Sequence, residues 1–247
     1  MTDNAPVPAA TLVILRDREG GAPELLMVER SRAMVFAGGA MVFPGGRIDP
    51  GDAALAARIA PGEEDAAAKI AAIRETIEEV GLPIGVQGLV DVAALRAALH
   101  AGVAFGEALA AAGATLDLDA LVPFARWLPG HKGTRIFDTR FFLARAREGD
   151  RASVDRTENV RLTWTGAADL IAAADRGEAR IIFPTRRNLE RLARFDSYGA
   201  AVADADAHPV RTITPFVEER EGTRWLCIPE GLGYPVTAEP FDTASRG

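Results

Sequence analysis

The chain has 247 residues, of which 48% are hydrophobic and 26% are charged, and its formal net charge is −7. These values describe a globular protein with a sizeable core, in which one compact domain is expected rather than two. The acidic balance and the lack of a long basic run argue against a polymeric nucleic acid as the partner.

The first predicted elements are two β-rich runs, ATLVILRD at residues 10–17 and PELLMVERS at 23–31, which a Gly-Gly-Ala-Pro turn divides. This order predicts a β-hairpin. The residues before it, MTDNAPVPAA, lack the basic and apolar regions of a signal peptide. We therefore expect a cytoplasmic protein.

A helix is predicted after residue 65. Asp65 is placed to cap its start, Gly81 to end it in a left-handed turn, and Pro83 to prevent its continuation. At about 100° per residue, one side of this helix is apolar and suited to the core. That side consists of Ile70, Ile73, Ile77 and Val80.

The opposite side of the helix carries three carboxylates, Glu75, Glu78 and Glu79. Like charges at this spacing cost an isolated helix about 0.2–0.5 kcal/mol per pair, so we expect a cation to offset the repulsion. Hard oxygen ligands in this number suit Mg²⁺ or Mn²⁺, which share their coordination with phosphates. Arg74 lies within the cluster, and we expect it to orient a carboxylate. A solvated acidic face is the simpler alternative for such a run alone.

The remaining elements mix helices and strands. Residues 91–120 are alanine-rich with helical periodicity and predict an inserted helical pair, which Arg96 and Glu107 interrupt too soon for a membrane span. This order predicts a mixed α/β fold with helices that cover both faces of a sheet. The other predicted elements are strands at 135–146 and 161–166, helices at 167–176 and 184–195, and a β-hairpin in the tail from His208 onward.

Cysteine and histidine usage excludes two kinds of site. Cys227 is the only cysteine, which excludes an internal disulfide and predicts a buried structural thiol. The three histidines are scattered without metal-ligand spacing, so a zinc site is not expected. They are His100, His131 and His208, and the PGHKG segment around His131 is interpreted as a turn.

The segment from residue 45 to residue 82 resembles the signature of the Nudix hydrolases, G-x5-E-x7-R-E-U-x-E-E-x-G-U, in which U is aliphatic. Asp52 stands where this signature has a glutamate, and fourteen extra residues, roughly 53–66, separate the two halves. The residues that match are Gly46, Arg74, Glu75, Ile77, Glu78, Glu79, Gly81 and Leu82.

The resemblance implies one Nudix domain over residues 1–247. It implies an α/β/α sandwich with a mixed β-sheet, insertions at approximately 53–66 and 91–120, and a C-terminal β-hairpin-like extension at approximately 208–247. Such additions commonly shape specificity pockets or the contacts of a homodimer. A plain structural extension is the simpler interpretation.

The resemblance also implies an activity, which is attack of a metal-activated water on the pyrophosphate of a nucleoside diphosphate linked to another group, X. The general base is left open between Glu75 and Glu158, which precedes the predicted strand at 161–166. For Glu158 an ordinary exposed loop charge is the alternative. The residues that would hold Mg²⁺ or Mn²⁺ are Glu75, Glu78, Glu79 and the carbonyl of Gly45.

Residues 26–46 indicate the identity of X. They resemble a pattern found in CoA-hydrolysing Nudix enzymes, L-L-T-x-R-S-x3-R-x3-G-x3-F-P-G-G. Val28 and Val35 depart from it, and Val35 replaces an arginine that would pair with a 3′-phosphate. The residues that match are Arg30, Ser31, Gly39 and Phe43 to Gly46. The favoured substrate is CoA or acyl-CoA, and the candidate substrate contacts are Arg30, Ser31 and Arg47.

Other interpretations stay open. The same chemistry suits ADP-ribose, a nucleotide sugar or a dinucleotide. A Nudix-fold regulator that binds a ligand without hydrolysing it is a second class, although such modules usually lose carboxylates from the helix. An unrelated α/β protein with an acidic helix is a third, against which the matched run at 74–82 argues. No membrane partner is expected.

Overall fold

The computed structural model describes residues 5–34, 37–130, 136–154 and 159–244. Its strands within these ranges are β1 Val7–Arg18, β2 Gly21–Arg30, β3 Met41–Val42, β4 Gly45–Arg47, β5 Val86–Gln87, β6 Thr115–Leu116, β7 Val122–Trp127, β8 Phe137–Arg145, β9 Asn159–Gly166, β10 Thr212–Ile213, β11 Phe216–Arg220, β12 Thr223–Cys227 and β13 Ala238–Pro240. Its helices are α1 Pro50–Ile59, α2 Ala66–Val80, α3 Val92–His100, α4 Phe105–Ala111, the 3₁₀ helix η1 Leu118–Ala120, α5 Ala167–Asp175, α6 Phe183–Leu192, α7 Tyr198–Ala207 and α8 Phe241–Ala244.

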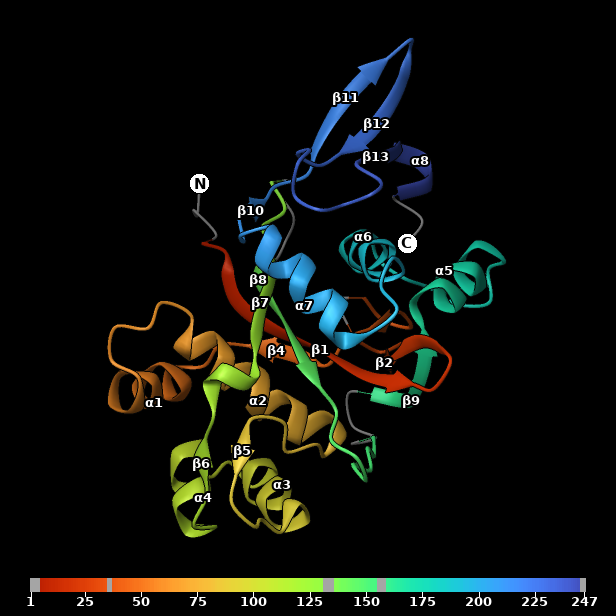
Figure 1. Ribbon diagram of the computed structural model, residues 1–247. Helices are drawn as coiled ribbons and strands as arrows, with labels where there is room; N and C mark the ends of the chain where they lie inside the picture. Colours follow the sequence, from red (N-terminus) through yellow and green to blue (C-terminus); the bar gives the residue numbers. More distant parts are fainter. Residues whose placement is uncertain (1–4, 35–36, 131–135, 155–158, 245–247) are drawn as a thin grey trace.

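The central sheet is mixed (Figure 1). Its strands follow the order β10-β7-β8-β1-β2-β3, with β4 paired to β1 and β9 paired to β2. β1 is parallel to β8, and β10 is parallel to β7. The pairs of β1 with β2 and with β4 are antiparallel, as is the pair of β2 with β9. The predicted hairpin of the first two strands is therefore confirmed.

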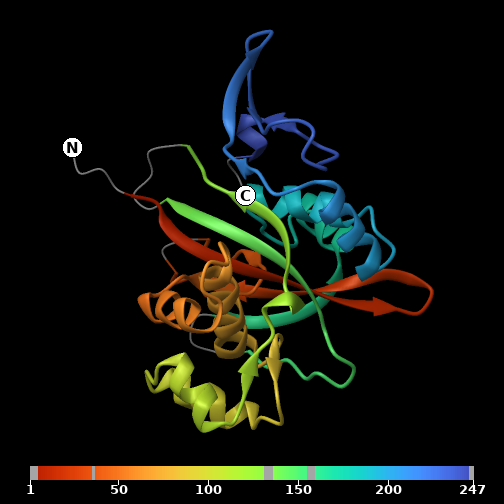
Figure 2. The same ribbon diagram turned by 60° about the vertical axis from the view of Figure 1, so that its left-hand side comes forward.

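Side chains of β1 alternate between two hydrophobic clusters, as the period of a strand requires. Leu12 and Ile14 pack in the cluster that contains the apolar side of α2. Val13 and Leu15 pack in the cluster that contains residues of α5, α6 and α7. Figure 2 shows α1 to α4 on one side of the sheet and α5 to α7 on the other. The predicted α/β/α sandwich is confirmed.

The helix α2 follows its sequence prediction at one end and departs from it at the other. All four apolar residues of its predicted core face are fully buried. Gly81 ends the helix with a φ of 65°, the left-handed conformation that favours glycine. Asp65 occupies the N-cap position, but its side chain makes no capping hydrogen bond. The predicted cap is wrong because Asp65 Oδ1 accepts instead from Arg140 Nε of β8, at 2.7 Å.

The predicted helical pair at 91–120 is present as α3 and α4, although residues 115–120 form β6 and η1 rather than helix. Residues 53–66 contain the remainder of α1, which begins earlier, at Pro50. The predicted tail hairpin is β11 and β12, which with β13 form a separate three-stranded sheet. This sheet projects from the body of the molecule in both ribbon views. Cys227 is buried, as predicted.

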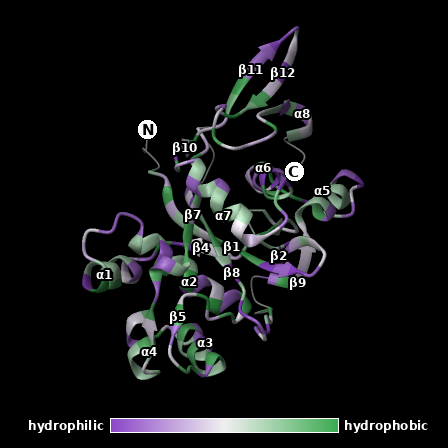
Figure 3. Ribbon diagram, viewed as in Figure 1, coloured by the Kyte–Doolittle hydropathy of each residue, from purple (hydrophilic) through white to green (hydrophobic). Residues whose placement is uncertain are grey.

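Hydrophobic and hydrophilic segments divide unevenly among the helices. Figure 3 colours most of α6 as hydrophilic, yet Arg187 and Arg191 of this helix are each only 1% exposed. Their charges are paired inside the protein, Arg187 with Glu239 at 2.9 Å and Arg191 with Asp204 at 2.8 Å.

Among the helices of the described ranges, none has the length and apolar character that a membrane crossing needs.

Candidate active site

The last two turns of α2 lie close to β4, whose glycines leave room for two carboxylates. Glu79 Oε2 accepts a 3.0 Å hydrogen bond from the amide of Gly45. A Cβ atom at Gly46 would overlap the carboxylate of Glu75, so a glycine permits this close approach. The strand β4 is in turn fixed by β1, where Thr11 faces Gly45. The carboxylate cluster therefore depends on the sheet as well as on the helix.

Arg74 joins α2 to α1 and to two of the carboxylates. Its Nε and Nη2 donate to the two oxygens of Asp52 at 3.0 and 2.9 Å. Its Nη1 lies 3.0 Å from Glu75 Oε1 and 3.3 Å from Glu78 Oε1. A further hydrogen bond, from Nη2 to the carbonyl of Arg47, measures 3.0 Å. Arg74 therefore pairs with both Glu75 and Glu78.

The guanidinium of Arg74 stays charged in this environment. Burial opposes its charge, but the hydrogen bond that it donates to Asp52 and the negative charges of Glu75, Asp52 and Glu78 raise its pKa above the usual value. Asp52 is 1% exposed and also accepts a hydrogen bond from the amide of Asp49, at 2.9 Å. Asp52, which is shorter than the glutamate of the Nudix signature, thus reaches Arg74 from α1. The extra residues at roughly 53–66 lie between the two in the sequence.

Replacing Asp52 with Asn is expected to lower the free energy of unfolding by about 3–5 kcal/mol. The substitution leaves the buried charge of Arg74 without its bidentate partner, and breaking a buried pair in this way is costly. Denaturation in urea measures the loss. The matched control is Asp65→Asn, because Asp65 pairs with Arg140 at 2.7 Å but its side chain is 31% exposed. That change should cost about 0–1 kcal/mol, and equal losses in the two variants would contradict the prediction.

Glu79 is the most buried of the three carboxylates. Burial raises the pKa of Glu79 to about 8, and the charge of Glu75 adds to the increase. Hydrogen bonds from the Asn159 side chain and the Gly45 amide, together with the positive charge of Arg30, act in the opposite direction. A second positive charge near these carboxylates would favour their ionised forms.

The predicted substrate contacts lie on β2, directly after β2 and on β4. Arg30 ends β2 opposite Asn159 of β9, and its charge acts on Glu79. Arg47 is exposed on β4. Ser31 follows β2, and its hydroxyl accepts from the amide of Ala33 at 3.4 Å. Three other residues singled out in the sequence, Glu158, Val35 and His131, lie outside the residues that the structure describes.

Sequence reasoning does not identify two neighbours of the cluster. Asn159 is fully buried beside Glu79, and its only signal in the sequence is a polar residue directly after Glu158. Arg96 of α3 donates to the backbone carbonyls of Glu78 and Glu79, at 2.8 and 2.9 Å. The feature of the sequence that indicates Arg96 is His100, four residues later. This spacing puts two cationic or polar side chains on one side of the predicted helix.

The three carboxylates of α2 are not arranged around one common point in this structure. Over the described ranges, no three acidic, histidine or cysteine side chains are arranged to hold a metal ion. The donor set nevertheless fits a hard divalent cation, because it consists of carboxylate oxygens from one helix beside a glycine backbone. Two of these carboxylates are gathered by Arg74 and the third by Gly45.

Comparison with known proteins identifies the family. The NUDIX domain family matches residues 6–100. The crystal structure of a NUDIX hydrolase from Alicyclobacillus acidocaldarius is 30% identical in sequence, with 82% of this chain and 97% of that chain covered and a TM-score of 0.74. This chain belongs to the Nudix hydrolase family. It is accordingly a pyrophosphohydrolase, and the resemblance to the Nudix family is confirmed.

Two more distant solved structures were also found by the comparison. A C. elegans Ap4A hydrolase binary complex is 22% identical, with 68% of this chain and 86% of that chain covered and a TM-score of 0.40. The MutT protein from Methanosarcina mazei Go1 is 14% identical, with 78% and 97% covered and a TM-score of 0.45. No curated protein matches the sequence.

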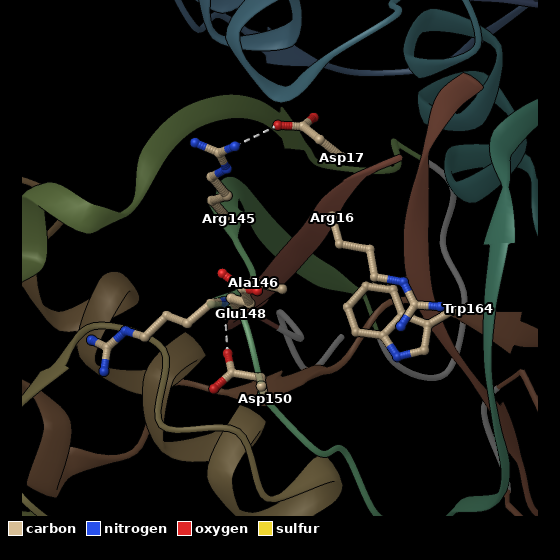
Figure 4. Close-up of a pocket in the computed structure, with 9 residues that line it drawn as sticks. Arg16, Asp17, Arg145, Ala146, Glu148, Asp150 and Trp164 are labelled. Carbon is tan, nitrogen blue, oxygen red and sulfur yellow. Dashed lines mark hydrogen bonds and ion pairs between the residues drawn. The ribbon is translucent and has the colours of Figure 1, made fainter. Parts of the chain in front are cut away.

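A cavity of about 600 Å³ in this Nudix hydrolase lies among other residues (Figure 4). Arg16 lies over the ring of Trp164 at 4.3 Å, and Arg145 pairs with Asp17 at 2.8 Å. Arginines and acidic side chains occur in equal number in its lining, so the cavity has no net formal charge. None of the predicted site residues lines it. The carboxylate cluster of α2, rather than this cavity, is the candidate active site.

Proposed function

We propose that this Nudix hydrolase cleaves the pyrophosphate bond of CoA or acyl-CoA, giving 3′,5′-ADP and 4′-phosphopantetheine or its acyl derivative. The observation that carries the hydrolytic part is the arrangement of Glu75 and Glu79 of α2 against the glycines of β4, with Arg30 beside them. The choice of CoA is supported by the match of residues 26–46 to the CoA-hydrolysing pattern.

The residues proposed to hold Mg²⁺ or Mn²⁺ are Glu75, Glu78, Glu79 and the carbonyl of Gly45. Such an ion supplies a Lewis acid that polarises a phosphoryl oxygen and lowers the pKa of the attacking water. Arg74 keeps Glu75 and Glu78 close together against their mutual repulsion.

The substrate brings further negative charge to this cluster. Arg30 and Arg47 are proposed to neutralise the pyrophosphate, since a guanidinium pairs well with phosphate oxygens. The hydroxyl of Ser31 is a third candidate contact. Either Glu75 or Glu158 would take the proton of the attacking water, and Glu75 pairs with Arg74 at 3.0 Å.

Hydrolysis of a substrate panel tests the proposal. CoA, acetyl-CoA, ADP-ribose, NADH, a nucleotide sugar and a diadenosine polyphosphate would be incubated with the protein and Mg²⁺ or Mn²⁺. We expect kcat/KM for the two CoA compounds to exceed the others by at least about tenfold, a difference of roughly 1.4 kcal/mol, with 3′,5′-ADP as a product. A chelator should stop the reaction.

A preference for another member of the panel would reject CoA as the substrate and leave the metal-dependent hydrolysis in place. Turnover that persists in excess chelator would reject the metal site.

A further inference from the structure

We propose that Arg96 of α3 is a positioning residue that fixes the last turn of α2, and through it the carboxylates of Glu78 and Glu79. The inference rests on the proposed function, since it concerns the residues proposed to hold the cation. It assigns to the α3–α4 segment a direct part in forming the active site.

The last four backbone carbonyls of a helix have no partner inside that helix. In α2 each of these four carbonyls accepts a hydrogen bond from a group beyond the end of the helix. The carbonyl of Ile77 accepts from the amide of Gly81 at 3.0 Å, and that of Val80 from the amide of Ser153 at 2.9 Å. The carbonyls between them accept from Arg96, Glu78 from Nε at 2.8 Å and Glu79 from Nη2 at 2.9 Å. One side chain therefore holds the backbone of both carboxylate residues.

Arg96 also ties this turn to a third segment. Its Nη1 donates to the carbonyl and to the hydroxyl of Ser153, each at 3.0 Å. The guanidinium packs over the end of α2, where a Cβ atom at Gly81 would lie 3.3 Å from both Arg96 Nη1 and Ser153 Oγ. His100, one turn further along α3, places Nε2 3.1 Å from the same Glu78 carbonyl. These contacts lock α2, α3 and the segment before β9 together.

The charge of Arg96 suits its position. The C-terminal end of a helix carries a partial negative charge, which a nearby cation stabilises. In α2 that end also bears three carboxylates, so the need for a cation is greater. An arginine meets it with a rigid planar fork that reaches four acceptors at once, whereas a lysine offers a point charge on a flexible stem. The geometry of the last turn, and not only its charge, therefore depends on arginine.

The test compares Arg96→Lys with the wild-type protein by Mn²⁺ binding, followed by electron paramagnetic resonance of the free ion without substrate. Loss of groups that orient metal ligands commonly weakens metal affinity by about 10–100-fold, and we expect the Kd for Mn²⁺ to rise about tenfold. Hydrogen exchange of the Gly81 and Ser153 amides in the metal-free protein should also accelerate.

The matched control is Asp91→Ala. The Asp91 side chain caps α3 by accepting from the amide of Ala94 at 3.1 Å, so its loss destabilises the same helix without removing Arg96. We expect this variant to lower the melting temperature and to keep the wild-type Kd for Mn²⁺. The variant Arg96→Gln, which retains polarity without charge, provides a second measurement should Arg96→Lys fold poorly.

Three results would overturn the inference, and they have different consequences. If the wild type binds Mn²⁺ and Arg96→Lys binds it equally well, Arg96 has no positioning role and the proposed function stands. If the wild type fails to bind Mn²⁺, the proposed function fails and the inference fails with it. A weaker affinity of the same size in Asp91→Ala would also overturn it, because general loosening of α3 would then suffice.

Discussion

Replacing Glu78 with Gln is expected to lower kcat by about 10³-fold while the protein stays folded. A Lewis-acid cation contributes several kcal/mol to the transition state, and each 1.4 kcal/mol corresponds to tenfold in rate. Glutamine has the size of glutamate but lacks the charge that would hold the cation. The Glu78 side chain is 26% exposed, and its ion pair with Arg74 measures 3.3 Å. Because a partly exposed ion pair contributes little, neutralising Glu78 should change the free energy of unfolding by less than about 1 kcal/mol.

The measurement is steady-state turnover of the best panel substrate at saturating Mn²⁺, with urea denaturation of the same preparation. Glu64→Gln is the matched control, because Glu64 is an exposed acid just before α2. It should retain wild-type turnover. Activity of Glu78→Gln within tenfold of the wild type would show that Glu78 holds no essential cation.

The second large effect is a fall in stability of the metal-free protein as pH rises. The pKa of Glu79 is about 8 in the folded protein against a reference value of 4.5. Between these values the folded protein binds a proton that the unfolded chain has released. The free energy of unfolding therefore falls by about 1.4 kcal/mol per pH unit, and the total loss on reaching pH 8 is on the order of 4 kcal/mol.

Urea denaturation between pH 5 and pH 8.5 in the presence of a chelator measures this effect. The variant Glu79→Gln has no proton to exchange at this position, so the difference between the two curves isolates Glu79. Saturating Mn²⁺ should restore more stability to the wild type at pH 8 than at pH 6, because it binds the ionised form. Parallel curves for wild type and variant would contradict the assignment.

Much of the site is visible in the sequence because it lies on one helix. The spacing that puts Glu75, Glu78 and Glu79 on one side of α2 is local, and so is the apolar side opposite. The partner of Glu79 is less accessible to sequence reasoning, since Gly45 lies 34 residues away in the chain. Arg96 and Asn159 are hidden for the same reason, because each reaches the cluster only after the sheet and α3 have packed.

The fold shows the same division between local and long-range information. Strands and helices with strong periodicity, such as β8 and α6, lie close to their predicted positions. Short strands were missed, among them β3, β4 and β10, because two or three residues carry no measurable pattern. The helix α7 was missed as well, since its sequence YGAAVADADA has almost no apolar side. The Asp65 cap was wrong because a charged partner in β8 competes for the same oxygen.

The parallel pairing of β1 with β8 has a consequence for synthesis of the chain. Val7 pairs with Phe137 and Leu15 with Arg145, so 130 residues separate each pair. At about 5–20 residues per second, β1 waits roughly 7–26 s on the ribosome for this partner. During that time the backbone N–H and C=O groups along this edge of β1 are unpaired, and such an edge is a template for aggregation. The strand that supports the glycines of the active site is therefore a segment where a nascent chain benefits from a chaperone.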